Sequence, residues 1–411
     1  MPIPAASTWI RARSDMPRDV IVLAIIAFFV AVGFGVMIPV LPVFARSFEV
    51  SNFMVGMVIS SFALMRLITS PFCGVMNNWA GERRVLGVGM FIVAGSSAAA
   101  GLATSFYGLL LMRAVGGIGS AMFTVAAMTL LLRSVDSSKR GRAAALYSSG
   151  FLIGGMTGPA IGGLFASISL TAPFFFYAAT LAIAGIVGLV LLTGKPVEPE
   201  DGAGFVPPPM KVVVRDVRYQ AALLTSFAQG WQSFGVRSAL IPVLIVEGLH
   251  RPPSWTGMSF AVAAIAQTAV LGPVGRAVDR IGRRPMMIAA GILTGLATLA
   301  TPFAPNIWVL TAILSVYGIG AAMHATAPAA TVGDVLGGRG GTPIAVYSMM
   351  SDVGAVIGPL AAGALADSLG MPVAFGIGAA LLMSGSLYSL RMPKVDPGPV
   401  RTPMTEPVST P

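Results

Sequence analysis

Long apolar segments, separated by short polar ones, follow one another along almost the whole chain. Each is about 20 residues or longer, which is the length that an α-helix needs to cross a hydrocarbon core of about 30 Å. Polar and charged residues gather in the intervals between the apolar segments. The pattern predicts twelve membrane-spanning helices, at residues 20–44, 53–76, 84–105, 106–131, 142–168, 170–194, 219–247, 254–279, 284–303, 306–334, 341–368 and 371–391.

The longest polar interval lies near the middle of the chain and is rich in proline and charged residues. We interpret this interval, residues 195–218, as a linker between an N-terminal six-helix half, 19–194, and a C-terminal six-helix half, 219–391. Residues 1–18 and 392–411 are terminal tails, and the proline content of the second tail predicts that it is disordered.

The two predicted halves repeat each other in sequence. Phe34-Gly35-Val36 recurs as Phe234-Gly235-Val236, and Gly117-Ile118-Gly119 recurs as Gly318-Ile319-Gly320. Parallel repeats of six spans are related by an axis along the membrane normal. The sequence therefore predicts an all-α polytopic membrane protein built from two pseudo-symmetric six-helix halves.

Composition and charge agree with this prediction and set the orientation. Only 10% of the residues are charged, against about 25% in soluble proteins. The net charge of +10 comes from basic segments on one side of the membrane, so we expect no nucleic-acid partner. Only Arg46 and Arg251 of the 26 Lys and Arg residues fall in the predicted outer loops. We therefore expect a cell-membrane protein with both termini in the cytoplasm.

A stripe of glycines marks the fifth predicted span and recurs in the eleventh. Glycines four residues apart lie on one face of a helix, and small residues let two helices in lipid approach closely. A proline in each stripe removes one backbone hydrogen bond. The residues are Gly150, Gly154, Gly158, Pro159 and Gly162 in the first copy, and Gly354, Gly358 and Pro359 in the second.

Two predicted cytoplasmic loops share a pattern of glycines, an acid and basic residues. The second copy holds Gly275, Asp279, Gly282, Arg283 and Arg284, and the first holds Gly74, Asn78, Gly81, Arg83 and Arg84. In the first copy Asn78 stands at the position of the acid, and Glu82 stands where a base is usual. These loops resemble the signature loops of the major facilitator superfamily.

Three further elements resemble the twelve-span drug:proton antiporters of that superfamily. They are Arg113 with the glycines that follow it in span 4, the glycine stripe of span 5, and the proline bend of span 1. The resemblance implies halves that rock about a central cavity and loops that act as gating latches. It implies that span 5 packs against span 8 and span 11 against span 2, between the halves. Asn78 leaves open whether the first loop makes the usual charged latch.

Ionisable residues inside spans are costly, and each is a functional candidate. Asp352 is the one acid deep in a span, and Arg66 lies at a similar depth in span 2. We expect Asp352 to carry the coupling proton with Arg66 as its partner, and the alternative is a static ion pair between the halves. We expect Arg113 and Arg237 either to bind an anionic substrate group or to pair with Asp352 in one state. The alternatives are backbone hydrogen bonds or a proton-pathway link for Arg113, and a snorkelling side chain for Arg237.

Polar and aromatic residues at mid-membrane depth are candidates for the substrate cavity. Packing between helices is the commoner role of such residues, and it remains the alternative for each of them. The candidates are Gln229, Gln232, Gln267, His324, Phe123 and Trp231.

No catalytic, metal or ATP site is indicated, because the chain has two histidines, one cysteine and no phosphate-binding GxxxxGK[ST] loop. We therefore expect a non-enzymatic secondary transporter without a cofactor that exports small organic molecules in exchange for protons by alternating access. Two alternatives remain: a facilitator or proton symporter for a nutrient, and a membrane sensor with a degenerate transport core. We expect a monomer whose partners are a small-molecule substrate, protons and the lipid bilayer.

Overall fold

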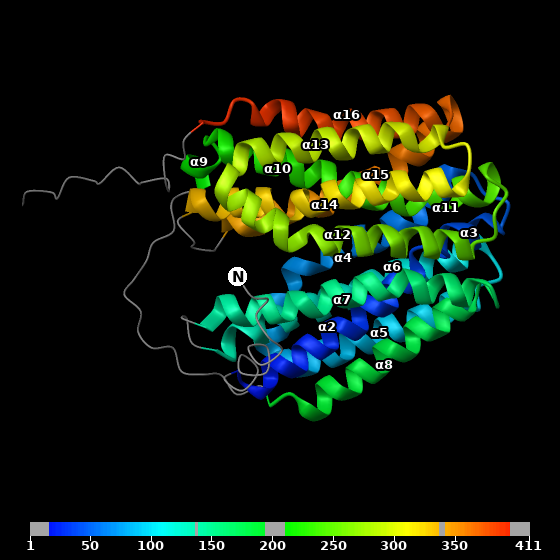
Figure 1. Cartoon of the computed structure of the whole chain (residues 1–411). Coiled ribbons are helices and arrows are strands. Elements are labelled where there is room, and N and C mark those ends of the chain that lie inside the picture. Colours follow the sequence, from blue (N-terminus) through cyan, green and yellow to red (C-terminus); the bar gives the residue numbers. More distant parts are fainter. Residues whose placement is uncertain (1–15, 136–138, 194–209, 337–341, 395–411) are drawn as a thin grey trace, which may run out of the picture.

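The computed structural model describes residues 16–135, 139–193, 210–336 and 342–394, and these residues form two helical bundles side by side (Figure 1). In each half the helices run back and forth between the two ends of the molecule. The start of α2 and the short helix α9 (Met210–Val213) lie at one end, which we call the terminal end. The opposite end is the far end.

The N-terminal half contains the six predicted spans. Its first span is divided into α2 (Arg18–Met37) and α3 (Leu41–Arg46), because Pro39 and Pro42 interrupt the backbone hydrogen bonds there. The other five spans are α4 (Asn52–Ala80), α5 (Glu82–Gly101), α6 (Phe106–Arg133), α7 (Arg140–Ala166) and α8 (Ala172–Leu191).

The C-terminal half repeats this arrangement after α9. Its first span consists of α10 (Val217–Gly230), the π-helical segment η2 (Trp231–Leu240), α11 (Ile241–Val243) and a second π-helical segment, η3 (Leu244–Gly248). The other spans are α12 (Ser254–Ile281), α13 (Arg283–Ala300) with the short η4 (Thr301–Phe303), α14 (Ile307–Leu336), α15 (Thr342–Leu369) and α16 (Met371–Ser389). Within the described residues, eleven helices are long and apolar enough to cross a membrane without a break, and the divided span from α10 to η3 makes the twelfth.

Local sequence sets where several of these helices begin and end. Ser51 and Ser105 accept backbone hydrogen bonds at the starts of α4 and α6, as N-cap residues do. Gly81 and Gly282 separate α4 from α5 and α12 from α13, with φ of 81° and 101°. A side chain would be strained at such a φ, so both sharp turns require glycine.

The glycines of the stripe pack within their own half, while its prolines lie at the contacts between the halves that we expected. A Cβ atom added at Gly150, Gly154, Gly158 or Gly162 would lie within 2.6 Å of a backbone carbonyl oxygen of α2, in the same half. Gly354 and Gly358 face α10 and η2 in the same way. The expected partners, α12 for α7 and α4 for α15, pack on these helices beside the prolines of the stripe. Gly163 meets Gly257 of α12, and Pro359 meets Gly56 of α4. The glycines of the stripe therefore bind each half together, and Pro159, Gly163 and Pro359 join the halves.

Candidate functional site between the two halves

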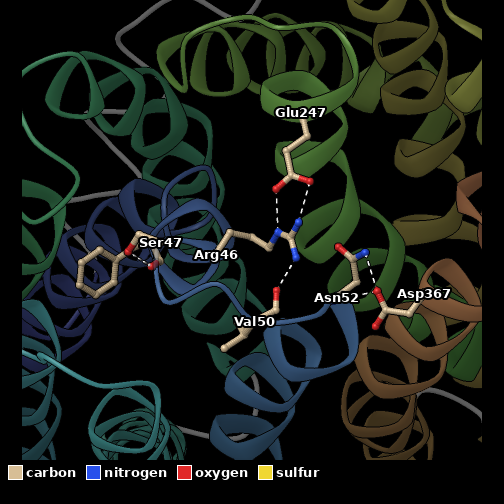
Figure 2. A network of polar contacts seen from close by, with 7 residues as sticks. Arg46, Ser47, Val50, Asn52, Glu247 and Asp367 are labelled. Carbon is tan, nitrogen blue, oxygen red and sulfur yellow. Dashed lines mark hydrogen bonds and ion pairs between the residues drawn. The ribbon is translucent and has the colours of Figure 1, made fainter.

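At the far end, polar contacts bridge the two halves (Figure 2). Arg46 at the end of α3 donates from Nε to Oε1 of Glu247 at 2.6 Å and from Nη2 to Oε2 at 2.8 Å. A third guanidinium nitrogen donates to the backbone carbonyl of Val50, which orients the side chain. The hydrogen bonds with Glu247 raise the pKa of Arg46 above its ordinary value. This two-pronged ion pair joins the end of the first span of one half to the end of the first span of the other.

A second far-end contact caps a helix of one half with an acid of the other. Asp367, near the end of α15, accepts hydrogen bonds from the backbone N–H and the side-chain amide of Asn52 at 3.0 and 2.8 Å (Figure 2). It also accepts one from the backbone N–H of Phe53 at 2.8 Å. The first N–H groups of a helix have no partner inside it and attract negative charge. Asp367 therefore fixes the start of α4 to the end of α15.

Arg66 of α4 and Asp352 of α15 form an ion pair near the middle of the spans. The structure thus brings together the two residues that their depth and the expected contact between spans 2 and 11 had predicted to be partners. Each side chain keeps over a quarter of its surface exposed, 27% for Arg66 and 29% for Asp352. Ser60 donates to the carbonyl of Val356 at 2.6 Å, nearer the far end of the same helix pair. In the described part of the chain, the pair Arg66–Asp352 is the polar link between the halves that lies nearest the terminal end.

A small cavity lies beside this pair, toward the far end. Its volume is about 40 Å³, enough for a few water molecules. Arg66 and Arg113 line it, together with the rings of Phe34, Phe62 and Phe234. The Phe34 ring lies 6.4 Å from the centroids of both Phe62 and Phe234. Spans from both halves therefore meet around a space with two guanidinium groups and three rings in its wall.

The two other arginines inside spans rest on aromatic rings. The guanidinium carbon of Arg113 lies 4.4 Å from the centroid of Phe62. That of Arg237, in η2, lies 5.0 Å from Phe260 and 5.9 Å from Tyr317. Arg113 is buried, with 6% of its surface exposed, and its Nε has no hydrogen-bond partner. Arg237 is not a snorkelling side chain, because rings inside its own half cover it.

Three of the cavity candidates lie inside the C-terminal half and not in the cavity. His324 contacts Thr294 of α13 through Nε2 at 3.0 Å. Gln232 donates to Thr298 of the same helix at 2.9 Å. The backbone of Trp231 packs on Gly358. All three pack between helices of this half, the commoner role for such side chains, and they do not line this cavity.

The remaining cavity candidates also fall outside the wall of this cavity. Phe123 is buried on α6, at the level where that helix passes Gly89 of α5. The backbone of Gln267 passes Gly318 of α14, and the side-chain oxygen of Gln229 is buried without a partner. Their positions along the predicted spans gave the depth of these residues, but not the face of the helix that they occupy.

The terminal-end loops form latches within each half. In the C-terminal half Arg283 donates to Asp334 at 2.7 Å, to Asp279 at 3.1 Å and to the carbonyl of Val278 at 3.0 Å. Arg284 donates to the carbonyl of Leu390 at 2.8 Å.

In the N-terminal half, Arg133 pairs with Glu82, and Arg83 donates to the carbonyl of Leu189. This half therefore has a charged contact through Glu82, and Asn78 is exposed and takes no part in it. Gly74 and Gly275 have nothing within 4 Å of the place where a Cβ would lie.

Sequence reasoning missed the far-end contacts. Arg46, Glu247 and Asp367 lie at span ends, where polar residues are common and do not by themselves indicate a function. One signal was available: Arg46 and Glu247 end corresponding spans of the two halves with opposite charges.

Comparisons with known proteins agree with this fold. The Major Facilitator Superfamily profile matches residues 23–250 and 222–410. The quinolone resistance protein NorA of Staphylococcus aureus is 25% identical over 381 residues, covering 89% of this chain and 95% of its own. The human synaptic vesicular amine transporter is 27% identical over 327 residues and 78% of this chain. The chain matches 63% of that protein's length.

Solved structures share the fold at low sequence identity. The nucleoside transporter NupG superposes with a TM-score of 0.73 at 14% identity, over 90% of this chain and 99% of its own. A bacterial homologue of the human lysosomal transporter Spinster, in an inward-facing and occupied conformation, gives 0.72 at 16% identity over 90% and 95%. With two six-helix halves, matching latches and a profile match across almost the whole chain, this multi-pass membrane protein belongs to the Major Facilitator Superfamily.

Proposed function

We propose that this protein is a secondary active transporter that exports small organic molecules in exchange for protons. The names of two relatives, a quinolone resistance protein and an amine transporter, support a small organic cargo. The family supports transport and not enzymatic catalysis. The basic loops of the terminal end favour its placement in the cytoplasm.

The ion pair between Arg66 and Asp352 is the observation that carries the proposal. It joins two helices from different halves at mid-span, so a movement of the halves changes it directly. In a low-dielectric site a carboxylate is stabilised by a nearby guanidinium and takes up a proton when that partner leaves. Opening α4 from α15 therefore loads Asp352 with a proton, and closing them releases it.

The distribution of contacts supports alternating access. The polar contacts that join the described parts of the two halves run from the far end to Arg66–Asp352. With the terminal end in the cytoplasm, this conformation is closed to the outside. The opposite conformation requires that Arg46 leave Glu247 and that Asp367 release the start of α4.

Proton release from purified protein in lipid vesicles tests the proposal. Candidate organic compounds are added to wild type, to Asp352→Asn and to Glu49→Gln, an exposed far-end acid that serves as a charge-matched control. We expect some compounds to release protons from wild type and from Glu49→Gln but not from Asp352→Asn. Thermal melting shows whether each variant is folded. Equal release from folded Asp352→Asn would contradict the role of Asp352.

A further inference from the structure

The interior of the spans carries more positive than negative charge. Three arginines, Arg66, Arg113 and Arg237, lie within spans of the described chain, and Asp352 is the one acid at comparable depth. Asp352 is already paired with Arg66. The other described acids lie at or near helix ends or in the loops. Among the described residues, Arg113 and Arg237 are therefore left without a counter-ion.

Arg113 is the better placed of the two to meet a ligand. It lines the cavity between the halves, whereas the rings of Phe260 and Tyr317 cover Arg237. The Arg113 side chain forms no hydrogen bond or ion pair with any described residue, and its Nε is buried. The Phe62 ring covers the guanidinium face, which leaves the N–H edge as its binding surface. A buried guanidinium without an anion is unfavourable in a membrane protein. A ligand that supplies an anionic group therefore gains binding free energy by pairing with it.

We propose that the cargo carries a carboxylate on an aromatic body and that Arg113 binds this carboxylate. The proposal rests on the proposed function only in assuming that the cavity receives an organic cargo. A guanidinium edge matches a carboxylate with two parallel hydrogen bonds. The rings of Phe34, Phe62 and Phe234 supply aromatic contacts to the body.

The size of the cavity determines how such a molecule lies. About 40 Å³ admits the carboxylate in place of a few waters but not an aromatic ring system. The ring system therefore extends out of the cavity, and the lining rings contact the part of it that lies next to the carboxylate.

Cationic amines fit this site poorly. An amine needs a carboxylate or an aromatic cage without a competing cation. The three rings are close to Arg113, and Asp352 is held by Arg66. The site thus differs in charge from what the name of the amine transporter relative would lead one to expect.

Three compounds with one ring system test this inference in binding measurements on purified protein in lipid nanodiscs at pH 7. They are 1-naphthaleneacetic acid, an anion at this pH, its neutral amide 1-naphthaleneacetamide, and the cation 1-naphthylmethylamine. We expect wild type to bind the acid at least tenfold more tightly than the other two. Equal or tighter binding of the amide or the amine overturns the proposal, as does no binding of the acid up to about 1 mM.

Variants then test the assignment to Arg113. Arg113→Gln should lose the preference for the acid, and Arg251→Gln, which removes an exposed far-end arginine, should keep it. A preference that survives in folded Arg113→Gln overturns the assignment. If Arg113→Gln does not melt cooperatively, Arg113→Lys replaces it. Lysine keeps the charge but loses the two-pronged geometry, so acid binding should weaken several-fold, and unchanged binding overturns the proposal.

The binding assay is independent of proton exchange. A preference for the acid without any proton release supports the carboxylate site and contradicts antiport. Proton release by the amine, without a preference for the acid, supports antiport and overturns the carboxylate site.

Discussion

The turn between α4 and α5 and the turn between α12 and α13 make the same contacts with opposite charges. Glu82 pairs with Arg133 in the N-terminal half, and Arg283 pairs with Asp334 in the C-terminal half. The two partners are 51 residues apart in both halves. The next residue in each turn donates to a carbonyl 106 residues further along. The position of the ion pair is therefore the same in both halves, and its polarity is reversed.

This reversal explains Asn78. In the C-terminal half Asp279 lies one helical turn before Arg283 and pairs with it. An acid at position 78 would lie in the same relation to Glu82 and would repel it. The neutral Asn78 thus accompanies the acid at Glu82, because an acid at position 78 would repel it. We call this pair of departures from the family pattern the compensated change.

Replacing glycine by alanine at the close helix contacts should have the largest effect on stability. The effect should be similar in the two halves. Gly154→Ala places a Cβ against the carbonyl of Phe28, and Gly354→Ala places one against that of Phe227. Because backbone cannot give way as a side chain can, we expect each to lower the free energy of unfolding by about 1–3 kcal/mol. Thermal melting in detergent measures this.

Gly155 provides the matched control, since a Cβ there has nothing within 4 Å. Gly155→Ala should be neutral or stabilise the protein by up to about 1 kcal/mol. Equal loss of stability in Gly154→Ala and Gly155→Ala would show that the contact with α2 is not responsible.

Reversing one charge in each latch should have a smaller effect, and a larger one in the C-terminal half. Arg283→Glu faces both Asp334 and Asp279, and we expect a loss of about 1–2 kcal/mol. Glu82→Arg faces Arg133, which is 55% exposed, so the loss should be about 0.5 kcal/mol. Thermal or denaturant unfolding of the purified protein gives both values.

The second reversal tests whether the two latches correspond. Adding Arg133→Glu to Glu82→Arg should restore stability fully. Adding Asp334→Arg to Arg283→Glu should restore it only in part, because Asp279 remains beside the new acid. Additive losses in either double variant would mean that the paired residues do not interact.

The smallest effect is expected at Asn78. Asn78→Asp should cost a few tenths of a kcal/mol beside Glu82. The same change should become neutral or favourable in the Glu82→Arg variant, which copies the C-terminal turn. A double-mutant cycle on unfolding measures the difference. If Asn78→Asp changed the free energy of unfolding with the same sign in both backgrounds, the compensated change would be contradicted.

The fold and part of the candidate site could be predicted from the sequence. Spans are long apolar segments, and length and composition are visible in one chain. Arg66 and Asp352 could be paired because both lie at mid-span on helices that the family resemblance places together. His324, Gln232 and Trp231 lay at suitable depths but face the interior of their own half. The rotation of a helix about its axis decides which way a side chain faces. The sequence does not reveal this rotation, because the helix surfaces are apolar almost all the way round.

The glycine stripe shows the same limit. Its spacing indicated close packing, which is correct, but nothing in Gly150 or Gly154 tells which helix lies opposite. The far-end contacts of Arg46 and Asp367 were not predicted because they depend on how two halves dock, and no local property of the chain reports it.

The half-exposed bridge between Arg46 and Glu247 has a consequence for populations. Exposed ion pairs are worth up to about 1 kcal/mol, and 1.4 kcal/mol is a tenfold ratio. With Arg46 and Glu247 exposed by 30% and 45%, this bridge tilts a balance between two conformers by about fivefold or less. Salt screens it further. The bridge is therefore a small part of what holds the far end closed, beside the cap from Asp367 and the packing of α15 on α4.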